Sequence, residues 1–371
     1  MKKKIIFFHP YSVYGGADLS ISKLIDSTPK DFSIDFITLS KKPKINFYTK
    51  RKINIIKIAC KSTLFSIFKL RDIIKKKSKF FNKIILLSNQ NFANILALIS
   101  SLNVKNVKNI SFERNHISEL DNSDTKISKL KNIIIKLLIK ITYRYSDLII
   151  GNSKELCNDL EKFVGRKVVN LYNFYDYNFI KKKAKSYLKK KIKFNKNIII
   201  NVGRLVDQKN QILLLKSFKI VNRENKDINL LIIGDGKKFK KFREYIIHHN
   251  LDKNIQILRN IKNALPYIKK SDLYVSTSKY EGFPNVIIEA TALDVPTIST
   301  KYKSGLSEIL LNGKGGLLIS KKSPQIIAKN IINHFSNKKF LKKKMQVSKK
   351  NLKRFNYKFG VEKYQKIIRN L

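Results

Sequence analysis

The chain has 371 residues and 43% hydrophobic content, which predicts two domains with their own apolar cores and excludes a disordered or fibrous protein. Its formal charge of +52, from 78 Lys and Arg against 26 Asp and Glu, raises nucleic acid or an anionic membrane surface as a partner. A genome rich in A and T would produce the same charge, because Lys, Ile and Asn have A/T-rich codons. The charge alone therefore does not show whether it serves to bind a polyanion or results from base composition.

The two cysteines, Cys60 and Cys157, lie far apart and have no metal ligands spaced around them. This predicts neither a disulfide framework nor a zinc site, and it favours a reducing compartment. The basic N-terminus is followed by a short apolar run, Ile5 to Phe8, which is too short for a signal peptide. No stretch approaches the ~20 apolar residues of a membrane span. We expect a cytoplasmic protein, either soluble or held peripherally at the inner face of the cell membrane.

Short β-branched apolar runs alternate with helical stretches through the first half of the chain. The runs that predict strands are "IIFF", "SIDFITL", "INIIKI", "KIILLS", "NISFE", "DLIIGNS" and "KVVNLYN". Their apolarity is continuous rather than alternating, as in parallel strands that are covered by helices on both faces. Residues 1–180 therefore predict a Rossmann-like, doubly wound α/β domain.

One helical stretch of this half, "KISKLKNIIIKLLIKITYRYSD", interleaves lysines with Ile and Leu on more than one face. Its lysines are Lys126, Lys129, Lys131, Lys136 and Lys140. A core helix with a basic outer edge explains the pattern. The alternative is an interfacial helix that touches anionic lipid, which would fit a lipid-linked acceptor.

The lysine run "KKKAKSYLKKKIK", residues 181–193, predicts a solvated connection at a domain boundary. The strand pattern then restarts with "NIIINVGRL", "INLLIIGDG", "IQIL", "LYVSTS" and "PTIST", which predicts a second α/β domain over residues 181–352. Helices follow from Ser323 onward. We expect the last helix, residues 353–371, to pack back on the first domain.

Two cations follow the first strand of the second domain. In "NVGRLVDQKN", Arg204 and Lys209 lie just past the strand's carboxyl end, where a helix begins. A forked, permanently charged Arg and a mobile Lys at a helix start suit a diphosphate. The other interpretation is that these are ordinary surface cations in a lysine-rich chain.

Two acids flank a turn in "YEGFPNVIIEATALDVP". Glu281 is placed on the loop and Glu289 in the helix that follows, with Gly282 and Pro284 in the turn between strand and helix. Carboxylates accept hydrogen bonds from vicinal hydroxyls, so sugars are the natural ligands of such a pair. The alternative is that one of the two acids stabilises the helix dipole at the start of the helix, while the other is an ordinary surface glutamate.

These segments together resemble a family. "GRLVDQKNQILLLKSF", "LLIIGDG", "SDLYVSTSKYEGFPNVIIEATALDVPTIST" and "SGLSEILLNGKGGLLI" look like, in the right order, the donor domain of the retaining glycosyltransferases of family 4, the group 1 glycosyl transferases. The resemblance covers nearly the whole second domain. It extends more weakly into the first through "YSVYGGADLS", "ERNHIS" and "DLIIGNSKELCNDL". It implies the GT-B fold, two Rossmann-like domains that face each other across a cleft.

The resemblance also implies roles for matched residues of the second domain. Arg204 and Lys209 are expected to hold the nucleotide diphosphate, Glu289 the ribose hydroxyls, and Glu281 the transferred sugar. The donor site would also include the residues at the turn and helix start, Gly282, Phe283, Pro284, Asn285 and Val286.

In the first domain, the resemblance places Gly15 and Gly16 in a glycine-rich loop where backbone approaches the diphosphate. A tight turn that merely needs glycine explains them equally well. His116 in "SFERNHIS" matches the histidine that faces the donor sugar and the acceptor, so we expect Arg204, Lys209, Glu281 and His116 to be the catalytic residues. The neighbours of His116, namely Glu113, Arg114 and Asn115, are candidates for the acceptor pocket.

The chain departs from the family pattern at several positions. Asp294 and Asn260 stand where glycine is usual, and the stretches Lys301-Tyr302-Lys303 and Leu306-Ser307 replace the family's usual residues. These changes leave the donor base and sugar open, although they remove none of the charged groups named above.

The resemblance implies a reaction in which a hexose or N-acetylhexosamine passes, with retention, from a UDP- or GDP-sugar to a glycan or lipid-linked acceptor. Such enzymes serve cell-surface polysaccharide, lipopolysaccharide or glycoprotein glycan synthesis. The sequence has no Asp-x-Asp, so we expect neither a metal ion nor another cofactor. The alternatives are a nucleotide-sugar-binding or epimerase-type relative without transferase activity, and a basic nucleic-acid-binding protein. The second would need a recognition module such as a zinc finger or an RRM, which we do not find, so we expect no nucleic acid partner.

Overall fold

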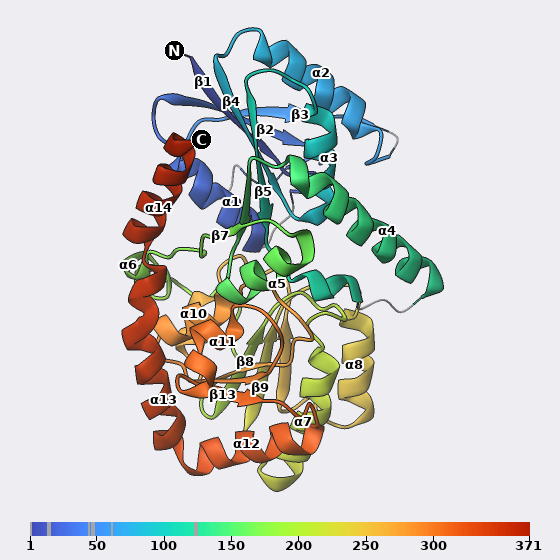
Figure 1. Cartoon of the computed structure of the whole chain (residues 1–371). Coiled ribbons are helices and arrows are strands. Elements are labelled where there is room, and N and C mark those ends of the chain that lie inside the picture. The colour runs from blue at the N-terminus through green and yellow to red at the C-terminus, as the bar shows by residue number, and fades with distance from the viewer. Residues whose placement is uncertain (1, 13–15, 44, 46–48, 61, 122–124) are drawn as a thin grey trace. The chain divides into compact units, whose positions relative to one another are not determined.

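The computed structural model describes residues 2–12, 16–43, 45, 49–60, 62–121 and 125–371. The chain forms two compact units, unit 1 (Met1–Phe174 with Tyr357–Leu371) and unit 2 (Tyr175–Asn356) (Figure 1). Each unit contains a parallel sheet between helices, so the predicted fold class is confirmed.

In the described part of unit 1, seven strands form a parallel sheet in the order β3-β2-β1-β4-β5-β6-β7. The strands are β1 (Lys3–Phe8), β2 (Phe32–Thr38), β3 (Asn54–Lys57), β4 (Lys83–Asn89), β5 (Val107–Glu113), β6 (Leu148–Gly151) and β7 (Val168–Asn170). The order reverses between β1 and β4, and ligands of such sheets bind beyond the carboxyl ends of the strands at this kind of switch point.

The helices of unit 1 cover both faces of its sheet. They are α1 (Gly16–Ser27), α2 (Ser66–Ser78), α3 (Asn91–Ser101), α4 (Lys126–Thr142), α5 (Lys154–Val164) and α14 (Tyr357–Asn370), with short 3-10 turns at Ile117–Asp121 and Tyr143–Tyr145. Alternate residues of β1 point to opposite faces. Ile5 and Phe7 pack in the core under α1 and α14, whereas Ile6 and Phe8 pack in the core under α2 and α3. This two-sided burial explains why the strands read as continuous apolar runs.

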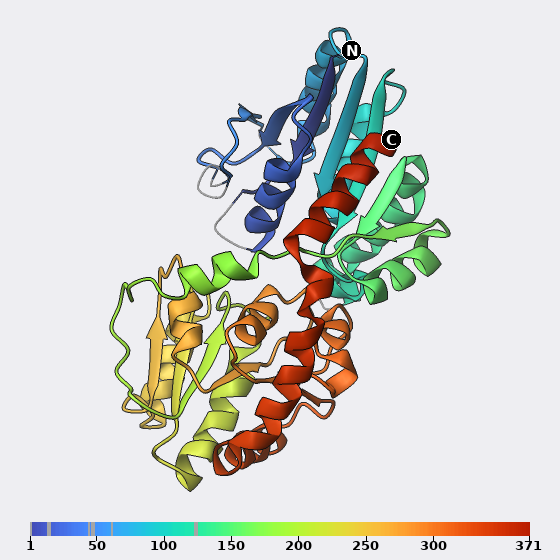
Figure 2. The ribbon, with the colours of Figure 1, turned by 90° about the vertical axis from the view of Figure 1, so that its left-hand side faces the viewer.

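The C-terminal helix α14 belongs to unit 1 although its sequence follows unit 2. Tyr364 and Ile368 are fully buried in the same core as Ile5. The Tyr364 hydroxyl lies 3.1 Å from Thr28 Oγ1, and Gln365 Nε2 donates to the carbonyl oxygen of Ser27 (3.0 Å). Figure 2 shows α14 beside α1 along one face of the sheet.

In unit 2, six strands form a parallel sheet in the order β10-β9-β8-β11-β12-β13. They are β8 (Ile198–Val202), β9 (Asn229–Ile233), β10 (Ile255–Leu258), β11 (Leu273–Ser276), β12 (Thr297–Thr300) and β13 (Leu317–Ile319). Here the order reverses between β8 and β11, so the loops that leave these two strands are neighbours.

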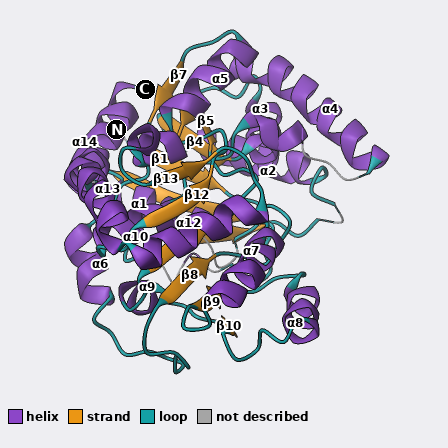
Figure 3. Ribbon diagram, turned by 90° about the horizontal axis from the view of Figure 1, so that it is seen from below, coloured by secondary structure: helices purple, strands orange, loops and turns teal. Residues whose placement is uncertain are grey.

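The helices of unit 2 lie around this sheet, and a large apolar cluster is buried against its strands. The helices are α6 (Tyr177–Lys183), α7 (Gln211–Glu224), α8 (Phe239–His248), α9 (Leu265–Lys269), α10 (Asn285–Ala292), α11 (Leu306–Ile309), α12 (Pro324–Ser336) and α13 (Lys338–Asn351), with 3-10 turns at Leu311–Gly313 and Leu352–Phe355. Figure 3 shows α7 and α12 side by side, and Phe218 of α7 and Ile331 of α12 share the cluster with Ile199 of β8.

The structure differs from the expected boundaries at two places. Unit 1 ends at 174 rather than 180, because Ile180 of α6 is buried within unit 2 ahead of the lysine run. The return to unit 1 occurs at 357 rather than 353, because Phe355 is buried within unit 2 against Phe283, with ring centroids 5.3 Å apart. The strand β13 was also missed, since its three residues follow two glycines and give too short a run.

One carboxyl group is buried in unit 1 at the end of β5. Glu113 accepts hydrogen bonds from the Tyr143 hydroxyl and from Asn94 Nδ2 (3.0 Å). Burial raises the pKa of Glu113 to about 7, and these two hydrogen bonds only partly oppose the rise. The folded protein therefore binds a proton at Glu113 over a pH range in which the unfolded chain has released it.

We expect the stability of the protein to fall as the pH rises past this range. The folded pKa of Glu113 is raised, so its contribution is fully present below about pH 4.5 and is lost as the pH rises through about 7. The free energy of unfolding, measured in urea at about pH 5 and about pH 8, should fall by up to about 3 kcal/mol through this group. Glu113→Gln, which imitates the protonated form, should remove this part of the fall, whereas Glu244→Gln on α8 should not. An unchanged pH dependence in Glu113→Gln would contradict the expectation.

Candidate functional site

The loop after β8 carries the first predicted cation. Arg204 is exposed and donates from Nη2 to Gln208 Oε1 (3.3 Å), while its carbonyl oxygen accepts from Gln211 Nε2 (2.9 Å). The end of the neighbouring strand β9 lies very close to this loop, since a Cβ at Gly234 would lie 1.9 Å from the carbonyl oxygen of Gly203. Glycine is therefore required at Gly234, and the backbone that precedes Arg204 is fixed.

The second cation meets the loop acid. Lys209 Nζ forms an ion pair with Glu281 Oε1, and Ser278 Oγ donates to the same oxygen (2.8 Å). The side chains of Lys209 and Glu281 are 21% and 13% exposed, so water screens the pair only in part. The aliphatic stem of Lys209 lies against Gly203, where a Cβ would come 3.2 Å from Cε. Two residues 72 positions apart are thus brought together with restricted side chains.

Hydrogen bonds join the loop after β8 to the loop after β11. Lys279 N donates to the carbonyl oxygen of Gln208 (2.8 Å), and Gln208 Nε2 donates to that of Tyr280 (3.2 Å). Thr277 Oγ1 donates to the carbonyl oxygen of Asn210 (3.0 Å). Because β8 and β11 are neighbours at the switch point, these bonds close one continuous edge that carries Arg204, Lys209 and Glu281.

The turn before α10 is buried and held from both sides. Gly282, Phe283 and Pro284 are buried, and the carbonyl oxygen of Gly282 accepts from Gly305 N (3.2 Å). Asn285 and Val286, the first residues of α10, are half-buried, and Asn285 Oδ1 accepts from the Tyr175 hydroxyl. The predicted turn residues therefore form a rigid entry to the helix.

Glu289 lies on α10, one turn past the start of the helix, and is half-buried. Burial raises the pKa of Tyr274 above its ordinary value, and the carboxylates of Glu281 and Glu289 raise it further. The Tyr274 side chain of β11 is therefore close enough to both acids to feel their charge, which places the two glutamates in one neighbourhood of unit 2.

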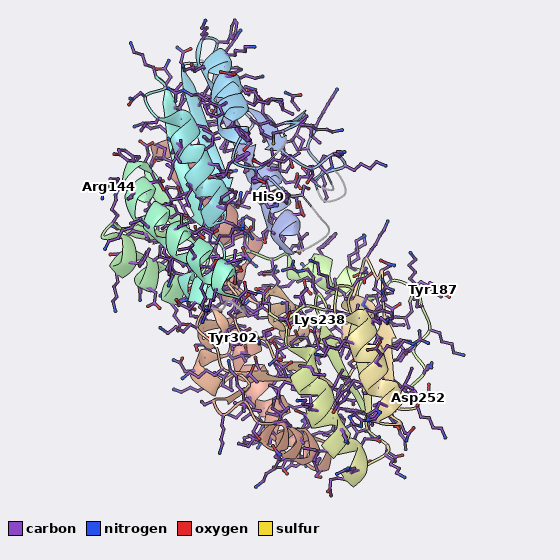
Figure 4. All side chains as sticks on the ribbon, turned by 90° about the vertical axis from the view of Figure 1, so that its right-hand side faces the viewer. His9, Arg144, Tyr187, Lys238, Asp252 and Tyr302 are labelled. Carbon is purple, nitrogen blue, oxygen red and sulfur yellow. The ribbon has the colours of Figure 1, made fainter. Side chains whose placement is uncertain are left out.

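Two tyrosines at this site were missed by sequence reasoning. Tyr274 sits in an apolar strand and looks like an ordinary core residue, and Tyr302 was noted only as a departure from the family. Burial raises the pKa of Tyr302 well above its ordinary value, with the Glu281 carboxylate adding to the effect (Tyr302 is labelled in Figure 4). Both hydroxyls stay protonated at neutral pH and so can donate hydrogen bonds beside the acids.

Two of the departures from the family have a backbone explanation. Asn260 has φ +59° and Asp294 has φ +65°, the left-handed conformation that glycine adopts most easily. Asn and Asp are the residues that tolerate this conformation best after glycine. The backbone at these positions therefore keeps the conformation that glycine favours, and Lys349 pairs with the Asp294 carboxylate (2.5 Å).

In unit 1, Gly15 lies outside the described residues, and Gly16 is the exposed first residue of α1. His116 is buried, and both of its ring nitrogens have partners. Nε2 donates to Asp159 Oδ2 (2.8 Å), and Nδ1 accepts from the backbone amide of Ser118 (3.1 Å). The ring is therefore fixed in one orientation, and Asp159 of α5 is a partner that the sequence did not reveal.

Arg114 is buried at the carboxyl edge of the unit 1 sheet. It donates from Nε to Asn89 Oδ1 (2.8 Å) and from Nη1 to Asn173 Oδ1 (3.2 Å), and it lies over the Phe112 ring. A small pocket beside it is lined by Arg114, Lys23, Tyr172 and Asn173, among others. Asn115 is half-buried next to it, whereas Glu113 is bonded to Asn94 and Tyr143 instead.

His9, which follows β1, was also missed (Figure 4). Burial, together with the nearby Arg114 cation, lowers the pKa of His9 to about 4, so the ring is neutral at physiological pH. Its Nε2 lies 3.9 Å from Asp18 Oδ1, and Ser12 Oγ donates to the same carboxylate oxygen (2.7 Å). Unit 1 thus has its own buried polar cluster at the ends of β1 and β5.

Across the described residues, no cluster of three or more His, Cys, Asp or Glu could hold a metal ion. Within the same residues, no helix is both long enough and apolar enough to cross a membrane.

Residues 183–354 match the model of the family described as glycosyl transferases group 1. An uncharacterized glycosyltransferase of Methanocaldococcus jannaschii, MJ1059, is 31% identical over 302 residues, which cover 78% of this chain and 73% of the relative. The N-acetylgalactosamine-N,N'-diacetylbacillosaminyl-diphospho-undecaprenol 4-alpha-N-acetylgalactosaminyltransferase of Campylobacter jejuni is 32% identical over 195 residues, 52% of each chain.

Among solved structures, HepE of Anabaena in complex with UDP-glucose superposes with a TM-score of 0.81 over 99% of this chain and 100% of its own, at 17% identity. That likeness gives the fold, which is GT-B. Together with the M. jannaschii relative and the family match, it supports one conclusion: the chain belongs to the group 1 glycosyl transferase family.

Proposed function

We propose that the protein is a retaining glycosyltransferase that moves a hexose or N-acetylhexosamine from a UDP- or GDP-sugar to a glycan or lipid-linked acceptor. The observation that carries the proposal is the Lys209–Glu281 pair at the switch point of unit 2, with Arg204 on the same edge and Glu289 nearby. A cation beside an acid suits a sugar diphosphate, because the phosphate needs the cation and the hydroxyls need the carboxylate.

The chemistry of transfer gives these groups their roles. As the bond between the anomeric carbon and the diphosphate breaks, negative charge grows on the leaving phosphate. Arg204 and Lys209 would stabilise that charge more in the transition state than in the bound donor, which is what lowers the barrier. We propose that this happens without a metal ion, since two side-chain cations supply the positive charge.

The acids would grip the donor rather than act as a glycosidase pair. Glu281 would hold hydroxyls of the sugar, and Glu289 would hold the ribose. Lys209, which pairs with Glu281 in this structure, would turn to the phosphate when the donor binds. The backbone of the turn from Gly282 to Val286 would line the same donor site. The hydroxyls of Tyr274 and Tyr302, which remain protonated, would be hydrogen-bond donors at the same edge of unit 2.

For unit 1 we propose the roles that the family resemblance implies. Gly15 and Gly16 would approach the donor diphosphate, and His116, with its ring fixed by Asp159, would contact the donor sugar and the acceptor. Arg114 and Asn115 would help form the acceptor pocket.

The relatives support the choice of substrates. The C. jejuni relative is named for a diphospho-undecaprenol acceptor, and a Staphylococcus aureus relative for capsular polysaccharide biosynthesis. The Anabaena HepE structures contain UDP, UDP-glucose, or UDP and glucose. We propose a cytoplasmic enzyme of cell-surface polysaccharide, lipopolysaccharide or glycoprotein glycan synthesis that works peripherally at the inner face of the membrane.

Removal of either cation should slow transfer strongly. We expect Arg204→Ala and Lys209→Ala each to lower kcat on the order of 100-fold or more, because each removes a donor aimed at the charge of the leaving group. The measurement is turnover of UDP- and GDP-sugars with lipid-linked acceptors. Lys240→Ala, at an exposed position of α8, is the matched control and should leave kcat unchanged. The proposal fails if no nucleotide sugar binds the wild type better than an Arg204→Ala, Lys209→Ala double variant.

The two acids should be separable by binding measurements. Glu289→Gln should weaken the nucleoside diphosphate and the nucleotide sugar alike, by about 10- to 100-fold, because both contain the ribose. Glu281→Gln should weaken only the nucleotide sugar, because the sugar-free diphosphate does not reach that carboxylate. Calorimetric titration of each variant with both ligands tests this, with Glu244→Gln as the control. If both acid variants lose affinity for the sugar-free diphosphate equally, the assignment of separate roles is wrong.

A further inference from the structure

Helix α4 is buried on one side only. Ile135 (8% exposed) and Ile139 (1% exposed) pack with Ile95 and Leu98 of α3. Asn132, on the same side, donates from Nδ2 to the carbonyl oxygen of Leu120 (2.9 Å). These contacts fix which face of α4 points outward.

The outward face of α4 is apolar along its whole length. The exposed side chains, which we call the outer stripe, are Ile127 (83%), Leu130 (61%), Ile133 (62%), Ile134 (49%), Leu137 (57%) and Ile141 (43%). Most of them follow a spacing of three and four residues, so they form one continuous band on the side opposite the buried face. Single exposed apolar residues are ordinary, but a contiguous band of this size marks an interaction site.

Cations border this band. At 100° per residue, Lys129, Lys136 and Lys140 lie along one flank of the outer stripe and Lys131 lies on the other, whereas Lys126 lies within the stripe at the first position of the helix. No Asp or Glu occurs anywhere in α4. Arg144, just past the end of the helix, is also exposed (Figure 4). Of these cations, Lys136 is paired with the carboxylate of Asp121.

We propose that the outer stripe of α4 is the surface by which this protein binds an anionic lipid bilayer, with the helix lying in the plane of the headgroups. An apolar face bordered by lysines is the arrangement that inserts shallowly between lipids while its cations meet the phosphates. The proposal rests on the proposed function, since a lipid-linked acceptor would be presented at such a surface.

A second copy of the chain is the main rival occupant, because the spacing also fits a helix-helix seam. Charge argues against it. Two α4 helices that paired through their stripes would place lysine rows side by side, with no acid on either helix to neutralise them. An anionic bilayer instead attracts the same lysines, so charge complementarity favours lipid.

Vesicle flotation of the full-length protein tests the proposal without any donor or acceptor. The vesicles are phosphatidylcholine alone, and phosphatidylcholine mixed with phosphatidylglycerol, at low and high salt. We expect binding to the anionic vesicles, and a triple variant of the outer stripe (Ile127→Ser, Leu130→Ser, Leu137→Ser) to bind at least tenfold less. The matched control is a triple variant of exposed apolar residues in unit 2 (Ile247→Ser, Phe340→Ser, Val347→Ser), which should bind as the wild type does.

A second pair of variants separates the local lysines from the overall charge. Lys129→Gln with Lys140→Gln should weaken binding by up to about fivefold per lysine at low salt, and by less at high salt. Lys240→Gln with Lys241→Gln on α8 removes the same charge elsewhere and should have little effect. Equal losses in the two variants would mean that binding follows net charge rather than α4, and would overturn the proposal.

Two other outcomes would also overturn it. One is full vesicle binding by the outer-stripe variant. The other is a wild-type dimer that becomes monomeric in the outer-stripe variant, seen by light scattering, while vesicle binding stays unchanged. Thermal melting of each variant checks that it is folded. Because no sugar nucleotide is present, failure here is distinct from failure of the proposed function, which the donor-binding measurements test.

Discussion

The site of unit 2 depends on a sheet that is buried on both faces. Because helices cover both sides of the strands, chemistry is confined to the loops at the carboxyl ends, and only neighbouring strands can bring two loops together. The reversal of strand order between β8 and β11 supplies that neighbourhood. Lys209 and Glu281 meet there because each follows one of these two strands, and the hydrogen bonds of Gln208 keep the loops joined.

The elements were predictable wherever a strand is apolar enough to fill both faces. Ile5 to Phe8 divides its side chains between two cores, which is why an uninterrupted apolar run identified β1 correctly. The predicted domain boundary was wrong where tertiary contacts outweigh local composition. The lysines after Ile180 suggested a linker, yet that one buried isoleucine attaches α6 to unit 2.

The charged residues of the candidate site could be named from the sequence, but their partners could not. Nothing in the local pattern says that Lys209 pairs with an acid 72 residues away, or that Tyr274, which looks like a core residue, lies near two carboxylates. The departures at Asn260 and Asp294 show the reverse case. They suggested a changed site, but their positive φ angles show that the backbone still adopts the left-handed conformation typical of glycine.

The sequence of α4 left two interpretations open, a core helix or an interfacial one, and the structure shows why composition could not decide. Ile139 and Ile127 are equally apolar, yet one is 1% exposed and the other 83%. The lysines of α4 differ from Lys209 in the same property, the exposure of the side chain to water. Lys209 is restrained and mostly shielded from water, so in the proposed function its single charge would be effective on one phosphate. The exposed lysines of α4 are screened by salt and are individually weak, so they are effective only together against an extended anionic surface.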